Sequence, residues 1–336
     1  MVLSGLRTTS WVLVSSALLF SAQQSYAKQQ DPQMFQVEKI EQAMKRFVKT
    51  PHPMASPEQR KYTQELKANL SKEGWDVQIQ KFKTKIPNVA AEKLGGKDKK
   101  VNPIKEVEGE NVLAFLKGSD RCLVMVGGHY DTKPYSNMKF VGANDGGSST
   151  AAMLELARVL NQIRKSEAGK NADGGRFMDC TVGLAFFDGE EATLADWNDG
   201  ERLLGVQDNI HGSRAFAAKL EKQFDGLAYN GLPLKLMMVI DMIGHKEQNL
   251  FITRGSNLQL AQKLLGQRTT TKIAAVNLQM DDDHMPFVQL GIPVLHIIDW
   301  TNLNEWHTAN DTLDIISHKH IADFGDMLVR FLKQRR

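Results

Sequence analysis

The feature that most constrains the fold of this chain is an apolar stretch at residues 181–187, with the sequence TVGLAFF. An almost uninterrupted apolar run of this length is typical of a β-strand buried on both faces of a sheet. The run is followed by Asp188-Gly189, a turn signal, and by two adjacent carboxylates, Glu190 and Glu191. Open α/β sheets place their ligands at the carboxyl ends of their strands. The stretch therefore predicts a buried strand that ends at a candidate site.

From Cys122 onward, predicted strands and helices alternate, which is the signature of a mostly parallel sheet. The predicted strands are residues 123–126, 181–187, 234–240 and 294–298, and the predicted helices cover residues 153–163, 212–220 and 321–332. Upstream, residues 33–72 read as two amphipathic helices, and strands follow from Trp75 and at residues 112–116. We expect residues 28–336 to form a single α/β catalytic domain whose central sheet is flanked by helices.

The first 27 residues are predicted to be a signal peptide. Arg7 supplies the positive region, residues 11–20 form a short apolar core, and Ser25-Tyr26-Ala27 fits a cleavage site. The core is shorter than the roughly 20 residues that span a bilayer. We therefore expect an exported protein, periplasmic or secreted, with no membrane span once the signal is removed, and we expect a monomer.

The net charge and the two cysteines bear on the expected partners and on a possible disulfide. The formal net charge of +3 comes without a basic stripe, so nucleic acid is not an expected partner. The two cysteines, Cys122 and Cys180, each precede a predicted strand, at the end away from the site. Export favours a structural disulfide between them, whereas their apolar surroundings suit two buried free thiols equally well.

Histidine and carboxylate side chains recur just beyond the predicted strands. They include His129, Asp131, Asp145, Glu190, Glu191, Asp241, Asp282, Asp283, His284 and His307. Each residue alone has a simpler interpretation, such as a helix cap, a turn or a solvated loop. Because nearly all of them fall at one side of the predicted sheet, they jointly indicate a zinc site with an open coordination position.

Six motifs give this constellation a family resemblance. They are HYDT (129–132), GANDGGS (142–148), FFDGEEA (186–192), VIDMIG (239–244), DDDHMPF (281–287) and WHT (306–308). From about Cys122 to Thr312 the chain resembles the zinc-dependent aminopeptidase clan, whose fold is a phosphorylase/hydrolase-like α/β sandwich. Within that clan it is most similar to the glutaminyl cyclase branch.

The resemblance implies a site and a reaction. Asp145, Glu191 and His307 would bind one zinc, Glu190 would be the general acid/base, and Asp241 and Asp282 would complete a carboxylate network. Trp197 and Trp306 would line the substrate pocket, with Trp300 or Leu303 replacing an aromatic residue that animal-type cyclases carry where this chain has Asn302. The implied reaction converts the N-terminal glutamine of a peptide or protein to pyroglutamate and releases ammonia.

The main alternative is an aminopeptidase, which uses two metals. His129 and Asp241 would then bind a second zinc, with Asp145 as the bridging ligand, and the sequence after the ligand histidine, Asn310-Asp311-Thr312, leans toward this pattern. Side chains that would hold or surround a second metal are Asp131, Asp283, His284 and His296.

Three features favour the cyclase and hence one zinc per chain: the position of Trp197, the Trp before His307, and the Asp-Asp-His run at 282–284. A third possibility is a binding domain that has lost catalysis. It is disfavoured because the Glu pair and the predicted zinc ligands are all present.

Overall fold

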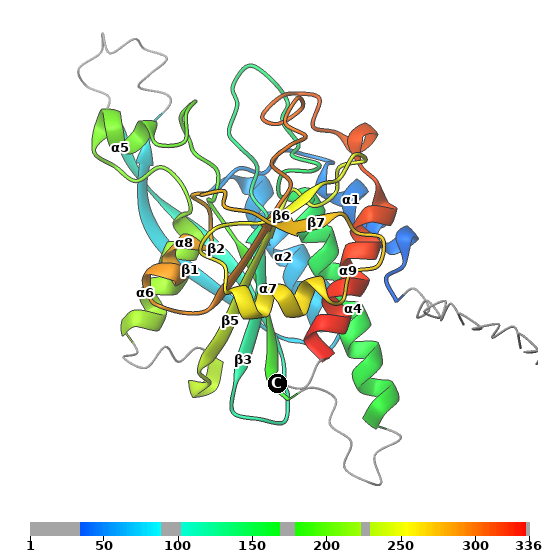
Figure 1. Ribbon diagram of the computed structural model, residues 1–336. Helices are drawn as coiled ribbons and strands as arrows, with labels where there is room; N and C mark the ends of the chain where they lie inside the picture. The colour runs from blue at the N-terminus through cyan, green and yellow to red at the C-terminus, as the bar shows by residue number, and fades with distance from the viewer. Residues whose placement is uncertain (1–33, 89–101, 169–178, 223–228, 334–336) are drawn as a thin grey trace, which may run out of the picture. The chain divides into compact units, whose positions relative to one another are not determined.

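The computed structural model describes residues 34–88, 102–168, 179–222 and 229–333, which form one compact unit (Figure 1). The predicted signal peptide and its cleavage site at residue 27 lie outside the described residues. Among the described helices, none combines the length and the apolar character needed to cross a membrane.

An eight-stranded mixed sheet forms the centre of this unit, in the order β1-β2-β4-β3-β5-β8-β6-β7. The strands are β1 (Asp76–Pro87), β2 (Ile104–Leu116), β3 (Leu123–His129), β4 (Thr181–Phe187), β5 (Leu234–Asp241), β6 (Leu250–Ile252), β7 (Ile273–Ala275) and β8 (Val294–Ile298). The four central strands, β4, β3, β5 and β8, are mutually parallel, which confirms the expected α/β class. Antiparallel pairing appears toward the edges, between β2 and β4 and between β8 and β6.

Helices cover both faces of the sheet (Figure 1). They are α1 (Val37–Phe47), α2 (Pro57–Lys72), α4 (Gly147–Ala168), α5 (Asp199–Leu204), α6 (His211–Lys222), α7 (Leu258–Leu265), α8 (Met285–Gln289) and α9 (His318–Lys333), with 3₁₀ turns at η1 (Tyr229–Gly231) and η2 (Leu313–Ile315). In β3, Val124 and Val126 pack in the core with α1, α2, α4 and α9, whereas Leu123 and Met125 pack with α6 and α8. The same alternation along β4 explains why that strand is apolar throughout.

The β1–β2 hairpin is longer than the sequence pattern predicts. It is paired in register from Asp76 opposite Phe115 to Pro87 opposite Ile104. The outer parts of both strands are rich in charged residues and mostly partly exposed, because they pair with each other beyond the part of β2 that pairs with β4. Edge strands hold their backbone pairing without an apolar run, so the pattern shows only the buried part of each strand.

Cys122 and Cys180 form a disulfide, which settles the alternative that the sequence left open. The two residues lie directly before β3 and β4, so the bond joins the amino ends of two parallel neighbours.

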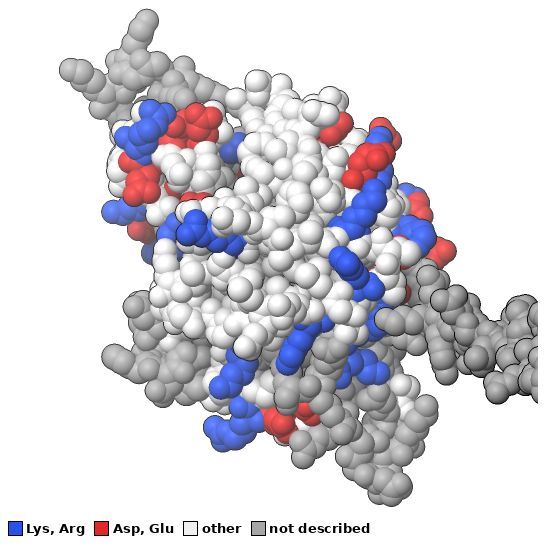
Figure 2. Space-filling model, viewed as in Figure 1, with Lys and Arg blue, Asp and Glu red and all other residues white. Residues whose placement is uncertain are grey.

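In the view of Figure 2, charged side chains of both signs lie mainly around the edges of the face, and its centre is largely uncharged.

Candidate active site

The parallel strands bring most of the predicted site residues to one edge of the sheet. His129 ends β3, Glu190 and Glu191 follow β4, and Asp241 ends β5. The segment after β8 carries Trp300, Trp306 and His307, while Asp145 lies in the turn before α4. Because parallel strands all point the same way, residues that are far apart in the sequence meet at this edge.

Asp145, Glu191 and His307 form one potential metal-binding group, and their ligand atoms all lie within 4.8 Å of one another. His307 Nε2 is 3.1 Å from Glu191 Oε2 and 3.4 Å from Asp145 Oδ2. Asp145 Oδ2 and Glu191 Oε1 are buried and make no hydrogen bond. Buried carboxylate oxygens without a donor are costly unless a cation satisfies them. One imidazole and two carboxylates fit a catalytic zinc ion, which keeps a further position open.

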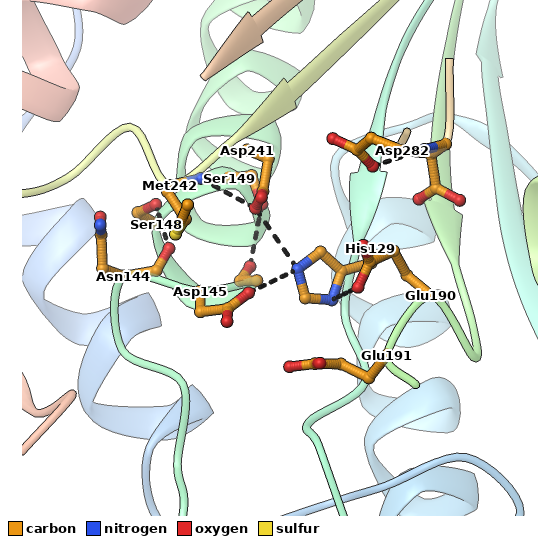
Figure 3. Close-up of polar contacts among 12 residues, drawn as sticks. His129, Asn144, Asp145, Ser148, Ser149, Glu190, Glu191, Asp241, Met242 and Asp282 are labelled. Atoms are coloured by element: carbon orange, nitrogen blue, oxygen red, sulfur yellow. Dashed lines mark hydrogen bonds and ion pairs between the residues drawn. The ribbon is translucent and has the colours of Figure 1, made fainter. Parts of the chain in front are cut away.

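His129 forms a second potential metal-binding group with Asp145 and Asp241, whose carboxylates both lie on the Nε2 side of its ring (Figure 3). Its Nε2 is 3.1 Å from Asp145 Oδ1 and 3.3 Å from Asp241 Oδ1, and its Nδ1 is 3.2 Å from the carbonyl oxygen of Asp131. Burial opposes protonation of the ring, but Glu190 and the surrounding aspartates outweigh it and raise the pKa of His129 well above its ordinary value. A protonated His129 donates from Nε2 toward Asp145 and Asp241 and from Nδ1 to the carbonyl oxygen of Asp131.

A third group comprises Asp282, His284 and His296. His296 Nε2 lies 2.7 Å from Asp282 Oδ2, and its Nδ1 lies 2.8 Å from the hydroxyl of Thr253. The rings of His284 and His296 are stacked, with centroids 4.0 Å apart and planes 4° from parallel. The nitrogen lone pairs of stacked rings lie in parallel planes and do not converge on one ion. This arrangement favours orientation of Asp282 over metal binding. Asp283 is buried beside it and donates its N–H to Asp282.

The carboxyl groups at the site differ in acidity. Burial raises the pKa of Glu190 well above its ordinary value, reinforced by Glu191 and Asp282 against the opposing effect of His129. Burial likewise raises the pKa of Asp241 to about 6, although His129 partly offsets it. For Asp282 the effect of burial is outweighed by His296, which lowers its pKa to about 2. Asp282 is therefore the most acidic of the three, and Glu190 and Asp241 hold their protons to higher pH than exposed carboxyl groups do.

A cavity of about 330 Å³ opens onto these groups. Its lining consists of the carboxylates and ligands Asp145, Glu190, Glu191, Asp241, Asp281, Asp282 and His307, the tryptophans Trp197, Trp300 and Trp306, and Leu278, Gln279, Met280 and Ile298. The Trp306 ring stacks on His307 at 3.8 Å between centroids, and Trp300 meets Trp306 edge-on at 5.1 Å. Leu303 is not part of this lining; its carbonyl oxygen accepts the N–H of Trp306 instead.

Two buried aspartates hold the site loops through backbone hydrogen bonds. Asp131 accepts the N–H groups of Glu190 at 3.1 Å and of Glu191 at 3.4 Å. Asp311 accepts those of Asn144 at 2.7 Å and of Asp145 at 3.1 Å. Sequence reasoning assigned no role to Asp311, and its only signal was its place shortly after the ligand histidine.

The backbone is strained at two positions of the site. His307 has φ of +56° and Met242, directly after Asp241, has φ of +47°. Residues with side chains adopt this left-handed region only where the surrounding structure enforces it, and such positions cluster at functional sites.

Comparison with known proteins agrees with this geometry. A bovine (Bos taurus) glutaminyl-peptide cyclotransferase-like protein is 27% identical over 309 residues, which cover 85% of this chain and 72% of that protein. A solved glutaminyl cyclase from an Acidobacteriales bacterium is 25% identical, with a TM-score of 0.68 over 90% of this chain and 96% of its own. A leucine aminopeptidase precursor from Bacteroides thetaiotaomicron VPI-5482 shares the fold equally well, with a TM-score of 0.68 at 17% identity over 90% of this chain and 98% of its own.

The model of one protein family, described as Peptidase family M28, matches residues 111–332. The match covers well over half of the chain and includes every strand from β3 to β8, together with all the predicted metal ligands. The chain therefore belongs to peptidase family M28.

Proposed function

We propose that this protein is a zinc-dependent glutaminyl-peptide cyclotransferase, which converts an N-terminal glutamine to pyroglutamate and releases ammonia. The observation that carries the proposal is the pocket, in which three tryptophans share a lining with Glu190 and the group formed by Asp145, Glu191 and His307. Its volume of about 330 Å³ lies at the small end of ligand pockets and suits a single terminal residue. Similar proteins from cattle and Drosophila melanogaster are named glutaminyl-peptide cyclotransferase, which supports the proposal.

The zinc ion would be held by Asp145, Glu191 and His307, whose unpaired buried oxygens fit a cation. Zinc in this position would supply Lewis acidity toward the side-chain carbonyl oxygen of the glutamine. Asp311 and Asp131 fix the backbone of the two carboxylate ligands, so the ligand geometry is set before a metal binds.

Glu190 is the residue we assign to proton transfer. The α-amine nitrogen of the substrate attacks the side-chain amide carbon, the new C–N bond closes the ring, and the bond to the amide nitrogen breaks. Glu190 takes one proton from the attacking amine and returns it to the departing nitrogen, which leaves as ammonia. Burial raises the pKa of Glu190 well above its ordinary value, which makes it a stronger base toward the attacking amine than an exposed carboxylate.

The tryptophan walls have a separate task. The nucleophile and the amide belong to the same residue, so the chief requirement is to hold the side chain folded back on the amine. Trp300 and Trp306, which meet edge-on beside His307, are the rings that we assign to this restraint. Asp282, kept ionised by His296, and Asp241 line the same cavity and would accept hydrogen bonds from the amine of the substrate.

An aminopeptidase is the second candidate, because the structure also assembles His129, Asp145 and Asp241 within 4.8 Å. A solved leucine aminopeptidase precursor has the same fold, so the fold does not separate the two activities. One metal per chain is favoured by the cyclase features of the sequence, since the two groups are alike in geometry: His129 Nε2 contacts Asp145 and Asp241 as His307 Nε2 contacts Glu191 and Asp145. A metal bound at either group would replace the proton on the histidine nitrogen that faces the carboxylates.

Mass spectrometry on glutamine-initiated peptides separates the candidates. Zinc-loaded protein is expected to release ammonia and leave the chain intact, above the rate without protein. The N-acetylated peptide is the control, because its blocked amine cannot cyclise. Release of the whole first residue would establish the aminopeptidase instead, and a zinc content of two per chain would accompany it.

Glu190→Gln is the matched variant for the assigned proton transfer. It is expected to lose turnover and to keep zinc, since Gln preserves the shape of the side chain but not its basicity. Loss of zinc from this variant would show that Glu190 is the ligand and that Glu191 moves the proton.

We also propose that the protein acts outside the cytoplasm. The disulfide between Cys122 and Cys180 supports this, because such bonds persist in oxidising compartments. Amino-terminal sequencing of the protein recovered from the native host tests it, with a mature chain that begins at Lys28 expected from the predicted cleavage site.

A further inference from the structure

The segment that carries Trp197 is closed at its base next to the catalytic pair. Residues 192–210 follow directly after Glu191, and the end of the segment returns to the backbone of residues 189–190. The N–H of Ile210 donates to the carbonyl oxygen of Glu190 at 2.9 Å, and that of His211 donates to Gly189 at 2.8 Å. We call this segment the Trp197 loop. It contains the short helix α5 and contributes Trp197 to the pocket.

Asp208 joins the two limbs of the Trp197 loop. Its side chain is 1% exposed, and its two carboxylate oxygens accept the N–H groups of Thr193 at 3.1 Å and of Leu194 at 2.9 Å. Gly200 of α5 packs against it, since a Cβ there would lie 2.4 Å from the Asp208 Cβ. Hydrogen bonds to a buried carboxylate are among the stronger ones in proteins, so this contact fixes the loop.

Two further buried side chains connect Asp208 with Trp197. The neighbouring Asn209 is 1% exposed and donates from Nδ2 to the carbonyl oxygen of Trp197 at 2.7 Å. Lys133 is 2% exposed and donates from Nζ to the carbonyl oxygen of Ala192 at 2.6 Å. Its positive charge also faces the carboxylate of Asp208. Lys133 lies outside the Trp197 loop, in the segment after β3, and its charge partly compensates that of the buried Asp208.

The Trp197 indole itself makes few polar contacts. Its one polar contact among the described residues is from Nε1 to Asp281 Oδ2, at 3.2 Å on the exposed rim. Asp208, Asn209 and Lys133 do not line the cavity, whereas Trp197 does. The position of Trp197 is therefore determined by buried side chains outside the cavity, which do not contact a bound ligand.

We propose that Asp208, supported by Lys133 and Asn209, is a positioning residue that determines substrate binding by holding Trp197 against the pocket. This inference rests on the proposed function and extends it to the residues that set affinity for the terminal side chain. Trp197 contacts substrate and transition state alike, so a displaced loop weakens uniform binding. The expected signature is a raised KM with an almost unchanged kcat.

The test is a double-mutant cycle on Trp197→Ala and Asp208→Ala, measured on a glutamine-initiated peptide. Each single variant is expected to raise KM roughly tenfold, as for a pocket wall displaced by a fraction of its width. The double variant is expected to match Trp197→Ala, because a missing indole cannot be misplaced further. Asp208→Asn, which keeps the side-chain shape and one acceptor, is expected to recover part of the wild-type KM.

Asp326→Ala is the matched control. Asp326 on α9 is also a buried aspartate that accepts two backbone N–H groups, from Met34 and Phe35. Losing it should lower stability without changing KM. Asn209→Ala provides a second, milder variant if Asp208→Ala does not fold, and it is expected to change KM in the same direction.

Hydrogen exchange of the zinc-loaded protein gives a readout that needs no activity. Asp208→Ala is expected to increase amide exchange in residues 192–210 and leave the β3 amides protected. An unchanged KM, additive effects in the double variant, or an equal KM rise in Asp326→Ala would overturn the inference. If the wild-type protein forms no pyroglutamate, the proposed function alone is refuted. The hydrogen-exchange data then decide the inference, and unchanged protection of residues 192–210 in Asp208→Ala would refute it.

Discussion

The sharpest quantitative prediction concerns Asp311, which holds a zinc ligand without belonging to the metal-binding group. Its side chain is 2% exposed and accepts the N–H groups of Asn144 and Asp145. Asp311→Ala leaves these two N–H groups buried without a partner. At about 1 to 3 kcal/mol for each such group, the free energy of unfolding should fall by roughly 2 to 6 kcal/mol.

The effect on the metal is separate from the effect on the fold. Supporting groups behind a metal ligand typically contribute a factor of 10 to 100 in affinity, or about 1.4 to 2.8 kcal/mol. We therefore expect the zinc dissociation constant of Asp311→Ala to rise by that factor. The assay is competition with a chromophoric chelator at fixed pH, under conditions where circular dichroism shows that the variant is folded.

Asn310→Ala supplies the local control, because Asn310 is an exposed neighbour of Asp311 in the same turn. It should alter neither the zinc affinity nor the stability. If Asp311→Ala loses stability but keeps its zinc dissociation constant within twofold of wild type, then the backbone of Asp145 is held by other contacts, and our account of ligand positioning is wrong.

Three further predictions follow from the structure. Replacing Cys122 and Cys180 by Ser releases a cross-link spanning 58 residues, so denaturant titration should show a loss of about 4 kcal/mol, with kcat/KM unchanged because the bond lies at the far edge of the sheet. Trp300→Ala should raise KM several-fold, whereas Leu303→Ala should not, since only Trp300 lines the cavity; equal effects would contradict the assigned pocket. Burial lowers the pKa of His211 from 6.5 to about 4, so its own contribution to stability should fall by about 3 kcal/mol as pH drops through this window, and His211→Gln should differ from wild type by that amount in the pH dependence of thermal melts.

Much of the fold follows from local patterns in the sequence. The apolar run at 181–187 is buried on both faces as β4, and the helix faces predicted in residues 33–72 and 321–332 pack into one core as α1, α2 and α9. These patterns are reliable because a buried strand or helix face must be apolar wherever it lies. The polar outer halves of β1 and β2 escape such reasoning, since backbone pairing at an edge makes no demand on side chains.

The sequence by itself also determined which chemical groups are available. His129, Glu190, Glu191 and Asp241 fall just beyond predicted strands, and parallel strands bring their ends together. That reasoning needs only the order of the elements along the chain. It gives no distances, and so it could not choose between one metal and two.

Only the tertiary structure decided how these groups are held. The two carboxylates with unpaired oxygens, the paired nitrogens of His129 and the stacked rings of His284 and His296 are relations between residues far apart in the chain. The same holds for the buried aspartates, such as Asp208 and Asp311, which fix backbone segments elsewhere in the fold. An aspartate in a loop looks the same in the sequence whether it is solvated or buried, because its hydrogen-bond donors are supplied by the fold.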